Sequence, residues 1–177
     1  GALMYEKISD GIFFEAGGTS VDISVIKNGK VMIKYAQVGG HKTYLQSLDV
    51  RTLGVAGGSM VRVNGGKIAD IGPRSAHIAG KEYECFQRDG ELDGSEVLFV
   101  SPRKDDPKEY VLVKNPAGRE YSLTLAGAAN LLGYIPEGDY ASGSTQTTKA
   151  AWDALGTYLG CTGEEAARQT MDLAMDK

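Results

Sequence analysis

Residues 14–25 read FEAGGTSVDISV, and this stretch decides the fold. Its glycine pair, Gly17-Gly18, separates two segments of strand character, which predicts two antiparallel strands joined by a tight turn. Because glycine has no Cβ, backbone N–H groups in such a turn can converge on an anion, and the hydroxyls of Thr19 and Ser20 add donors. One interpretation is a hairpin whose turn holds a phosphate group. The alternative is a plain hairpin turn with both hydroxyls exposed.

Two carboxylates flank this turn, Glu15 before it and Asp22 after it. Mg²⁺ keeps several of its waters and is usually bound through one or two carboxylates together with phosphates. We therefore expect Asp22 to belong to the phosphate site and Glu15 to contact magnesium through water.

The composition is that of an ordinary globular domain. The 177 residues are 42% hydrophobic and 24% charged, so we expect one compact unit with its own core. The formal net charge is −4 and the basic residues are scattered, so no nucleic-acid partner is expected. No apolar run approaches the roughly 20 residues that cross a bilayer, which predicts no membrane partner and a soluble, cytoplasmic protein.

The cysteines and histidines are too few and too widely spaced for a disulfide framework or a zinc site. Cys85 and Cys161 are expected to be inert thiols. No nucleophile motif accompanies His41 or His77, so we expect both to be polar residues without a catalytic role.

Glycine-rich turns divide the first part of the chain into strands. The chain has 24 glycines, many of them in pairs, and Asn28-Gly29 is a strong signal for a two-residue hairpin turn. Residues 43–53 have the spacing of either a helical turn or a strand, and we favour a buried strand that ends at Gly54. Gly72-Pro73 is expected to end a second hairpin. The predicted strands cover residues 12–16, 20–27, 30–36, 61–63 and 67–71.

The second part of the chain combines a small β-meander with helices. Strands are expected over residues 97–100, 110–113 and 121–125, and helices over residues 126–132 and 146–159. Thr162 and Glu165 have the spacing of a capping box that begins a last helix. The apolar stripe of that helix has no stop signal, so we expect the natural chain to continue beyond Lys177.

Three segments together resemble one protein family. The first is the pattern acid-x-Gly-Gly-Thr-Ser-x-Asp, which resembles the internal phosphate motif of the hydantoinase A/5-oxoprolinase family. Residues 48–60, LDVRTLGVAGGSM, resemble the family's LDVxTIGAGGGSI, and residues 71–76, IGPRSA, resemble its VGPxSA. Their order and spacing also match. The resemblance covers most of residues 12–80 and 125–177.

The resemblance implies a fold and an activity. The fold would be α/β, a ribonuclease-H-like lobe of the actin-like ATPase type, with a mixed sheet beginning with antiparallel hairpins, C-terminal helices and a small inserted β-meander at about residues 86–120. Residues 1–177 would form a single nucleotide-binding lobe of a longer protein. Such proteins clamp ATP and Mg between two lobes and open cyclic amides such as hydantoin or 5-oxoproline. A hydantoinase-B-type subunit or domain normally takes part, and related enzymes carboxylate ketones.

The resemblance also assigns a second nucleotide element, although the same residues could form a tight turn that lets two strands approach closely. The residues of this element are Gly54, Gly57, Gly58 and Ser59. Cys85 only imperfectly resembles the cysteine of the family's Pro-x-Cys-Tyr motif, and we do not expect it to be a nucleophile.

The chain departs from the family pattern in its acidic residues. Glu15 stands where the family has aspartate, and Gly127 or Ala128 stands where another aspartate is usual. Only one acid-x-Gly-Gly-Thr element is present, so the chain is expected to supply half of an active site and not to turn over alone. Three alternatives stay open: a non-catalytic regulatory or assembly domain, a ketone-carboxylase relative, and a generic actin-like kinase.

Overall fold

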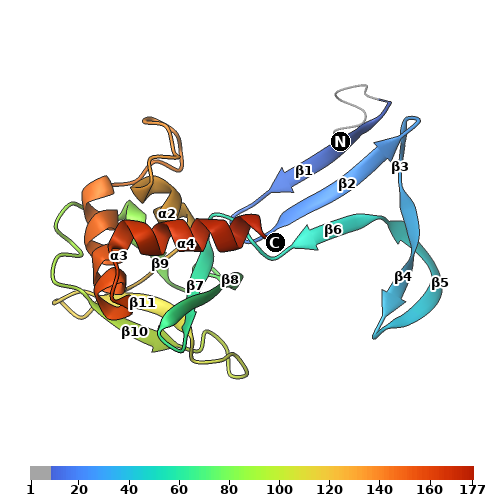
Figure 1. Ribbon diagram of the computed structural model, residues 1–177. Coiled ribbons are helices and arrows are strands. Elements are labelled where there is room, and N and C mark those ends of the chain that lie inside the picture. Colours follow the sequence, from blue (N-terminus) through green and yellow to red (C-terminus); the bar gives the residue numbers. More distant parts are fainter. Residues whose placement is uncertain (1–8) are drawn as a thin grey trace.

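The computed structural model describes residues 9–177 and consists of a compact body joined to an extended arm (Figure 1). The arm contains β1 to β6, and the body contains the remaining strands and all the helices. The predicted single compact unit is therefore realised only in the body. Residues 1–8 of the predicted lobe lie outside the described residues.

The predicted glycine hairpin is the root of the arm. β1 (Gly11–Ala16) pairs antiparallel with β2 (Val21–Lys27), and β6 (Val50–Leu53) pairs with the other edge of β2. A short strand, β3 (Lys30–Val31), follows the Asn28-Gly29 turn, as the turn signal predicts. The turn between β1 and β2 and the end of β6 both face the body (Figure 1).

The predicted single strand over residues 30–36 is wrong, because the chain changes partner at Met32. After that residue, β4 (Ile33–Val38) leaves β2 and pairs with β5 (His41–Leu48) in a separate two-stranded hairpin. Gly39 and Gly40 both have positive φ, 58° and 82°, which is the geometry of a tight hairpin turn. This local turn lets β4 pair with its sequence neighbour.

Residues 43–53 are extended, as favoured, but form two strands, β5 and β6. The second ends at Leu53, immediately before Gly54. It is not buried as predicted, since Arg51 and Thr52 are exposed. β6 is the edge of a narrow sheet, and the described residues do not cover that edge.

The body begins with the second predicted hairpin, β7 (Ser59–Asn64) and β8 (Lys67–Ser75). Gly65 and Gly66 form its turn with positive φ. Gly72-Pro73 does not end β8, contrary to the prediction, and the strand continues to Ser75. β8 lies at the edge of its sheet, where a residue without an N–H group removes no ladder hydrogen bond.

The body's sheet has six strands in the order β8-β7-β11-β12-β9, with β10 paired to β11. The predicted meander is confirmed as β10 (Glu96–Val100), β11 (Tyr110–Lys114) and β12 (Glu120–Ser122). β9 (Glu82–Tyr83) runs parallel to β12, so the sheet is mixed. Val111, Leu112 and Val113 are fully buried, which makes the meander part of the central core.

Three α-helices pack on this sheet: α2 (Leu125–Leu131), α3 (Thr145–Leu159) and α4 (Gly163–Met175). Ser144 caps α3, Gly160 ends it in a left-handed conformation, and Thr162 with Glu165 forms the predicted capping box. The main core joins helices and sheet through Trp152, Leu155, Ala166, Ala167, Val61, Ile71, Val111 and Val113. Within residues 9–177, no helix is long and apolar enough to cross a membrane.

Candidate nucleotide-phosphate site

The structure brings together the two glycine elements that the sequence singled out. The first is the turn of residues 17–20, here called the glycine turn, and the second is the loop of residues 54–59. The N–H group of Gly58 donates to the carbonyl oxygen of Gly18 at 2.9 Å. Beside this contact, the hydroxyls of Thr19 and Ser75 are hydrogen-bonded at 3.1 Å. The site therefore lies where the arm meets the body.

The glycine turn has free backbone donors. Its closing bond runs from the N–H group of Gly17 to the carbonyl oxygen of Ser20 at 2.9 Å. The N–H groups of Gly18, Thr19 and Ser20 donate to no acceptor within residues 9–177. Successive unpaired N–H groups in a turn form the kind of concavity that binds anions.

Neither glycine of the turn is required by the fold. A Cβ on Gly17 would lie 3.6 Å from the carbonyl oxygen of Ser20, and one on Gly18 would lie 3.6 Å from the hydroxyl of Tyr83, both ordinary contact distances. Neither residue has positive φ. A small side chain would therefore be tolerated at both positions, so the packing of the fold does not account for these glycines.

The loop of residues 54–59, in contrast, uses its glycines for packing. A Cβ on Gly58 would lie 2.0 Å from the Tyr83 hydroxyl and 2.5 Å from the carbonyl oxygen of Gly18, and one on Gly54 would lie 3.1 Å from Pro73. These distances match the alternative of a tight turn between closely spaced segments. Nucleotide contact by this loop stays a prediction.

The other two predicted residues of this loop, Gly57 and Ser59, also make hydrogen bonds within the body. The carbonyl oxygen of Gly57 accepts from the N–H group of Ala126 at 2.7 Å, at the start of α2. Ser59 is fully buried, and its hydroxyl accepts from the N–H group of Ala56 at 2.9 Å. A Cβ on Gly57 would meet only Ala126, at an ordinary contact distance of 3.8 Å, so packing does not require glycine at this position.

The two predicted acids face each other across the hairpin. Glu15 and Asp22 are directly opposite in the register of β1 and β2, one pair away from the glycine turn. The carboxylate of Asp22 accepts a hydrogen bond from the Thr52 hydroxyl of β6, which fixes its position. Within residues 9–177, no cluster of three or more His, Cys, Asp or Glu could hold a metal by itself. Contact of Glu15 and Asp22 with magnesium through water stays a prediction.

The sequence analysis missed a buried carboxylate at Glu84, in the short 3₁₀ helix η1 (Glu84–Phe86). Its carboxylate accepts from the Thr124 N–H group at 3.2 Å, the Thr124 hydroxyl at 3.0 Å and the Trp152 indole N–H at 3.0 Å. Burial raises the pKa of Glu84 to about 7, and the hydrogen bonds from Thr124 and Trp152 offset only part of that effect. No local pattern indicates this role, because the donors lie 40 and 68 residues further along the chain.

Glu84 also explains the glycine at position 127. A Cβ on Gly127 would lie 1.6 Å from a carboxylate oxygen of Glu84. The chain lacks the family's aspartate at this point of the sequence, and the structure places the carboxylate of another residue there. That carboxylate is fully buried and is directed into the body.

The cysteines and histidines form no catalytic group with the glycine turn. Cys85 is buried, and burial raises the pKa of its thiol, as does the neighbouring Glu84. Such a thiol is a poor nucleophile. His41 is exposed at the start of β5, and His77 is exposed just after β8.

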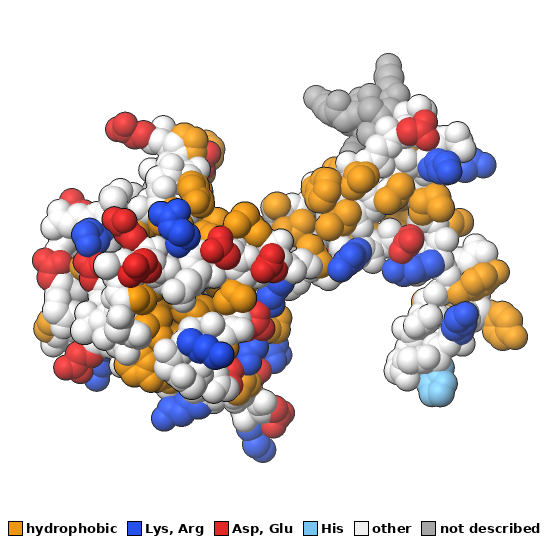
Figure 2. Space-filling model, viewed as in Figure 1, with side chains coloured by type: hydrophobic (Ala, Val, Ile, Leu, Met, Phe, Trp, Pro, Cys, Tyr) orange, Lys and Arg blue, Asp and Glu red, His pale blue; other side chains and the backbone are white. Residues whose placement is uncertain are grey.

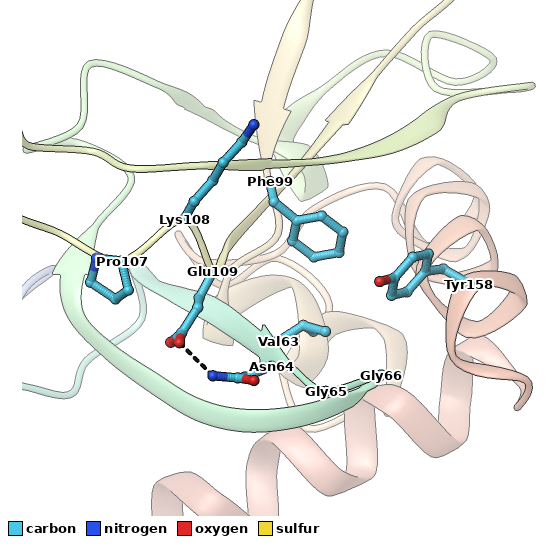
Figure 3. A pocket seen from close by; sticks show the side chains of 9 residues that line it. All are labelled: Val63, Asn64, Gly65, Gly66, Phe99, Pro107, Lys108, Glu109 and Tyr158. Atoms are coloured by element: carbon cyan, nitrogen blue, oxygen red, sulfur yellow. Dashed lines mark hydrogen bonds between the residues drawn. The ribbon is translucent and has the colours of Figure 1, made fainter.

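A separate hollow lies at the opposite end of β7 from Ser59 (Figure 3). Phe99 and Tyr158 form one side of it, and Glu109 accepts a hydrogen bond from Asn64 at 2.7 Å. None of the predicted site residues lines this hollow. This hollow is therefore separate from the junction at the glycine turn.

Comparisons with known proteins bear on the family and the fold of the chain. The sequence model of the hydantoinase/oxoprolinase family matches residues 1–177, the whole chain. No curated protein gives a significant match. A nucleotide-free structure of acetone carboxylase, from work on ATP-dependent acetone carboxylation, matches with a TM-score of 0.62 and 20% sequence identity. The match covers 96% of this chain and 21% of that one, so the chain spans about a fifth of that protein. The predicted α/β fold class is confirmed by this likeness.

Proposed function

The chain belongs to the hydantoinase/oxoprolinase family, and we propose that it is the ATP-binding lobe of an enzyme that opens a cyclic amide, such as hydantoin or 5-oxoproline. The observation that carries the proposal is the glycine turn. Among the residues that the structure describes, the N–H groups of Gly18, Thr19 and Ser20 have no acceptor, and the fold does not explain the two glycines of the turn. A phosphate group would use both features.

Each residue of the site has a part in this proposal. The N–H groups of the turn would hold a phosphate, with donors fixed in advance by the closing bond at Gly17. Asp22, fixed by Thr52, and Glu15 opposite it would accept hydrogen bonds from magnesium-bound water. Bound Mg-ATP would supply the phosphoryl group that activates an amide oxygen.

The arm gives a reason to propose further protein around this lobe. Its sheet exposes large apolar side chains, and they gather on β1 and β2 (Figure 2). Ile12 and Phe14 are each 60% exposed, and the register places them opposite Val25 and Ile23 on one face. Contiguous apolar surface of this kind marks an interaction site. We propose that the second nucleotide-binding lobe of a longer, cytoplasmic protein and a hydantoinase-B-type subunit complete the enzyme.

Binding of Mg-ATP to this chain tests the proposal. In a ¹⁵N NMR titration with Mg-ATP, the amide signals of Gly18, Thr19 and Ser20 should shift and then reach saturation, with a dissociation constant that indicates weak binding. Gly18→Ala should weaken this binding at least about tenfold, because the new methyl group occupies the phosphate space. The melting temperature should stay unchanged, since the methyl group meets only the Tyr83 hydroxyl at 3.6 Å.

The matched control is Ala117→Val, which adds apolar volume on an exposed loop of the body and should leave the affinity unchanged. Equal binding by the unaltered chain and Gly18→Ala would contradict the phosphate site. Rapid ATP hydrolysis by the chain alone would contradict the idea that it supplies only half of an active site.

A non-catalytic regulatory or assembly role is the second candidate. One observation favours it: the carboxylate beside position 127 belongs to Glu84, which is fully buried and bonded to Thr124 and Trp152. Such a group cannot reach a substrate without rearrangement. In the longer protein, unchanged activity and nucleotide binding after Gly18→Ala would support this candidate against the first.

A further inference from the structure

The hydroxyl of Tyr83 lies at the contact between the two glycine elements. It is 2.0 Å from where a Cβ on Gly58 would stand and 3.6 Å from where a Cβ on Gly18 would stand. Neither element predicts this residue, which comes from β9 in the body. Within residues 9–177, this hydroxyl makes no hydrogen bond.

The rest of the tyrosine is firmly held. Its backbone pairs with Ser122 of β12, and its carbonyl oxygen accepts from the Gln87 side chain at 2.8 Å. The ring stacks on Phe86 with centroids 5.5 Å apart and packs against the smaller core cluster around Met60. The next residue is the buried Glu84. The hydroxyl is therefore fixed in space without being used by the fold.

We propose that Tyr83 is a phosphate-binding residue, whose hydroxyl donates a hydrogen bond to a phosphate oxygen held on the N–H groups of residues 18–20. The inference rests on the proposed function and adds a ligand contact from the body to those of the arm. The tyrosine would make binding depend on both parts of the chain. The Tyr83 hydroxyl could reach the bound phosphate only while the arm is docked on the body, because the hydrogen bond between Gly58 and Gly18 sets the distance from this hydroxyl to the glycine turn.

The protonation state of the Tyr83 hydroxyl suits a hydrogen-bond donor. Burial raises the pKa of the Tyr83 hydroxyl, and the neighbouring Cys85 and Glu84 act in the same direction. The hydroxyl therefore keeps its proton at neutral pH and can donate to an anion. If it merely filled space above Gly58, a phenylalanine ring would serve equally well.

Tyr83→Phe tests the inference, because it removes one oxygen and keeps the stacked ring. The chain is titrated with Mg-ATP and, separately, with inorganic pyrophosphate, and binding is followed at the amide signals of residues 18–20. Both ligands should bind about tenfold more weakly to the variant, as expected for loss of a hydrogen bond to a charged group. Tyr158→Phe, which removes a hydroxyl at the separate hollow, should bind like the unaltered chain.

A spectroscopic signal separates a direct contact from a structural effect. The chain is labelled with ¹³Cζ-tyrosine, and the Tyr83 resonance is assigned as the one that is missing from the spectrum of Tyr83→Phe. In the unaltered chain this resonance should shift on addition of pyrophosphate. The shift does not depend on the stability of the variant. Equal affinities, or a ¹³Cζ resonance that does not move while the amides of residues 18–20 do, would overturn the inference and leave the proposed function standing. Failure of the unaltered chain to bind either ligand would overturn both.

Discussion

Glu84→Gln is expected to remove a large part of the pH dependence of folding. In the folded chain the pKa of Glu84 is about 7, against an ordinary value of 4.5. Between these values the folded state holds a proton that the unfolded state has released, so the free energy of unfolding falls as the pH rises from about 4.5 through about 7. The two values differ by about 2.5, and each pKa unit corresponds to about 1.36 kcal/mol, which gives a loss of about 3 kcal/mol.

The variant should keep the contacts of the carboxylate. A glutamine carbonyl can accept from the N–H groups of Thr124 and Trp152, which both reach the same oxygen of Glu84. The amide group can donate to the Thr124 hydroxyl, which now donates to the other oxygen. Glutamine does not titrate, so the pH-dependent loss disappears while the packing remains.

Urea unfolding at several pH values measures this effect, with the fluorescence of the single tryptophan, the buried Trp152, as the readout. The stability of the unaltered chain minus that of Glu84→Gln should fall by about 3 kcal/mol between pH 4.5 and pH 8. Glu82→Gln, two residues earlier and exposed, is the control and should follow the unaltered chain. A difference that stays constant across this range would refute the reasoning, because Glu84 would then have the same charge in both states.

Three further variants test the packing of the site and the helices. Gly58→Ala should destabilise the chain by more than about 2 kcal/mol in thermal or urea unfolding, because its Cβ would lie 2.5 Å from a backbone oxygen; unchanged stability would mean that the glycine elements do not touch. Gly127→Ala should be at least as damaging, since its Cβ would lie 1.6 Å from the Glu84 carboxylate, and a stable variant would place that carboxylate elsewhere. Thr162→Ala removes the capping box of α4 and should cost about 1 kcal/mol in urea unfolding; no loss would show that the cap is dispensable.

The elements that the sequence predicts well are those with local causes. The Asn28-Gly29 and Gly65-Gly66 turns and the capping box at Thr162 each depend on residues a few positions apart. The pairing of residues 33–38 with β5 also has a local cause, the tight turn at Gly39-Gly40, but the Asn28-Gly29 turn just before them indicates a continuous strand beside β2.

The candidate site follows the same division. The glycine turn is visible in the sequence because it is formed by consecutive residues. Glu84 and Tyr83 are not, because their roles depend on contacts with Trp152, 68 residues ahead, and with Gly18, well before them. A buried carboxylate and a surface one have the same letter in a sequence, and only the donors around them distinguish the two.

The surroundings of each glycine show whether the fold requires it. Gly58 has a backbone oxygen and a ring where a side chain would stand, and Gly72 has positive φ and a carbonyl oxygen 2.5 Å from its missing Cβ. The fold alone accounts for both. Gly17 and Gly18 have no positive φ, and the nearest atom to where a Cβ would stand is 3.6 Å away; within residues 9–177, N–H groups beside them at the junction of arm and body are unpaired. The fold does not account for these two glycines, and free N–H groups favour the approach of an acceptor such as an anion, in keeping with the proposed phosphate site.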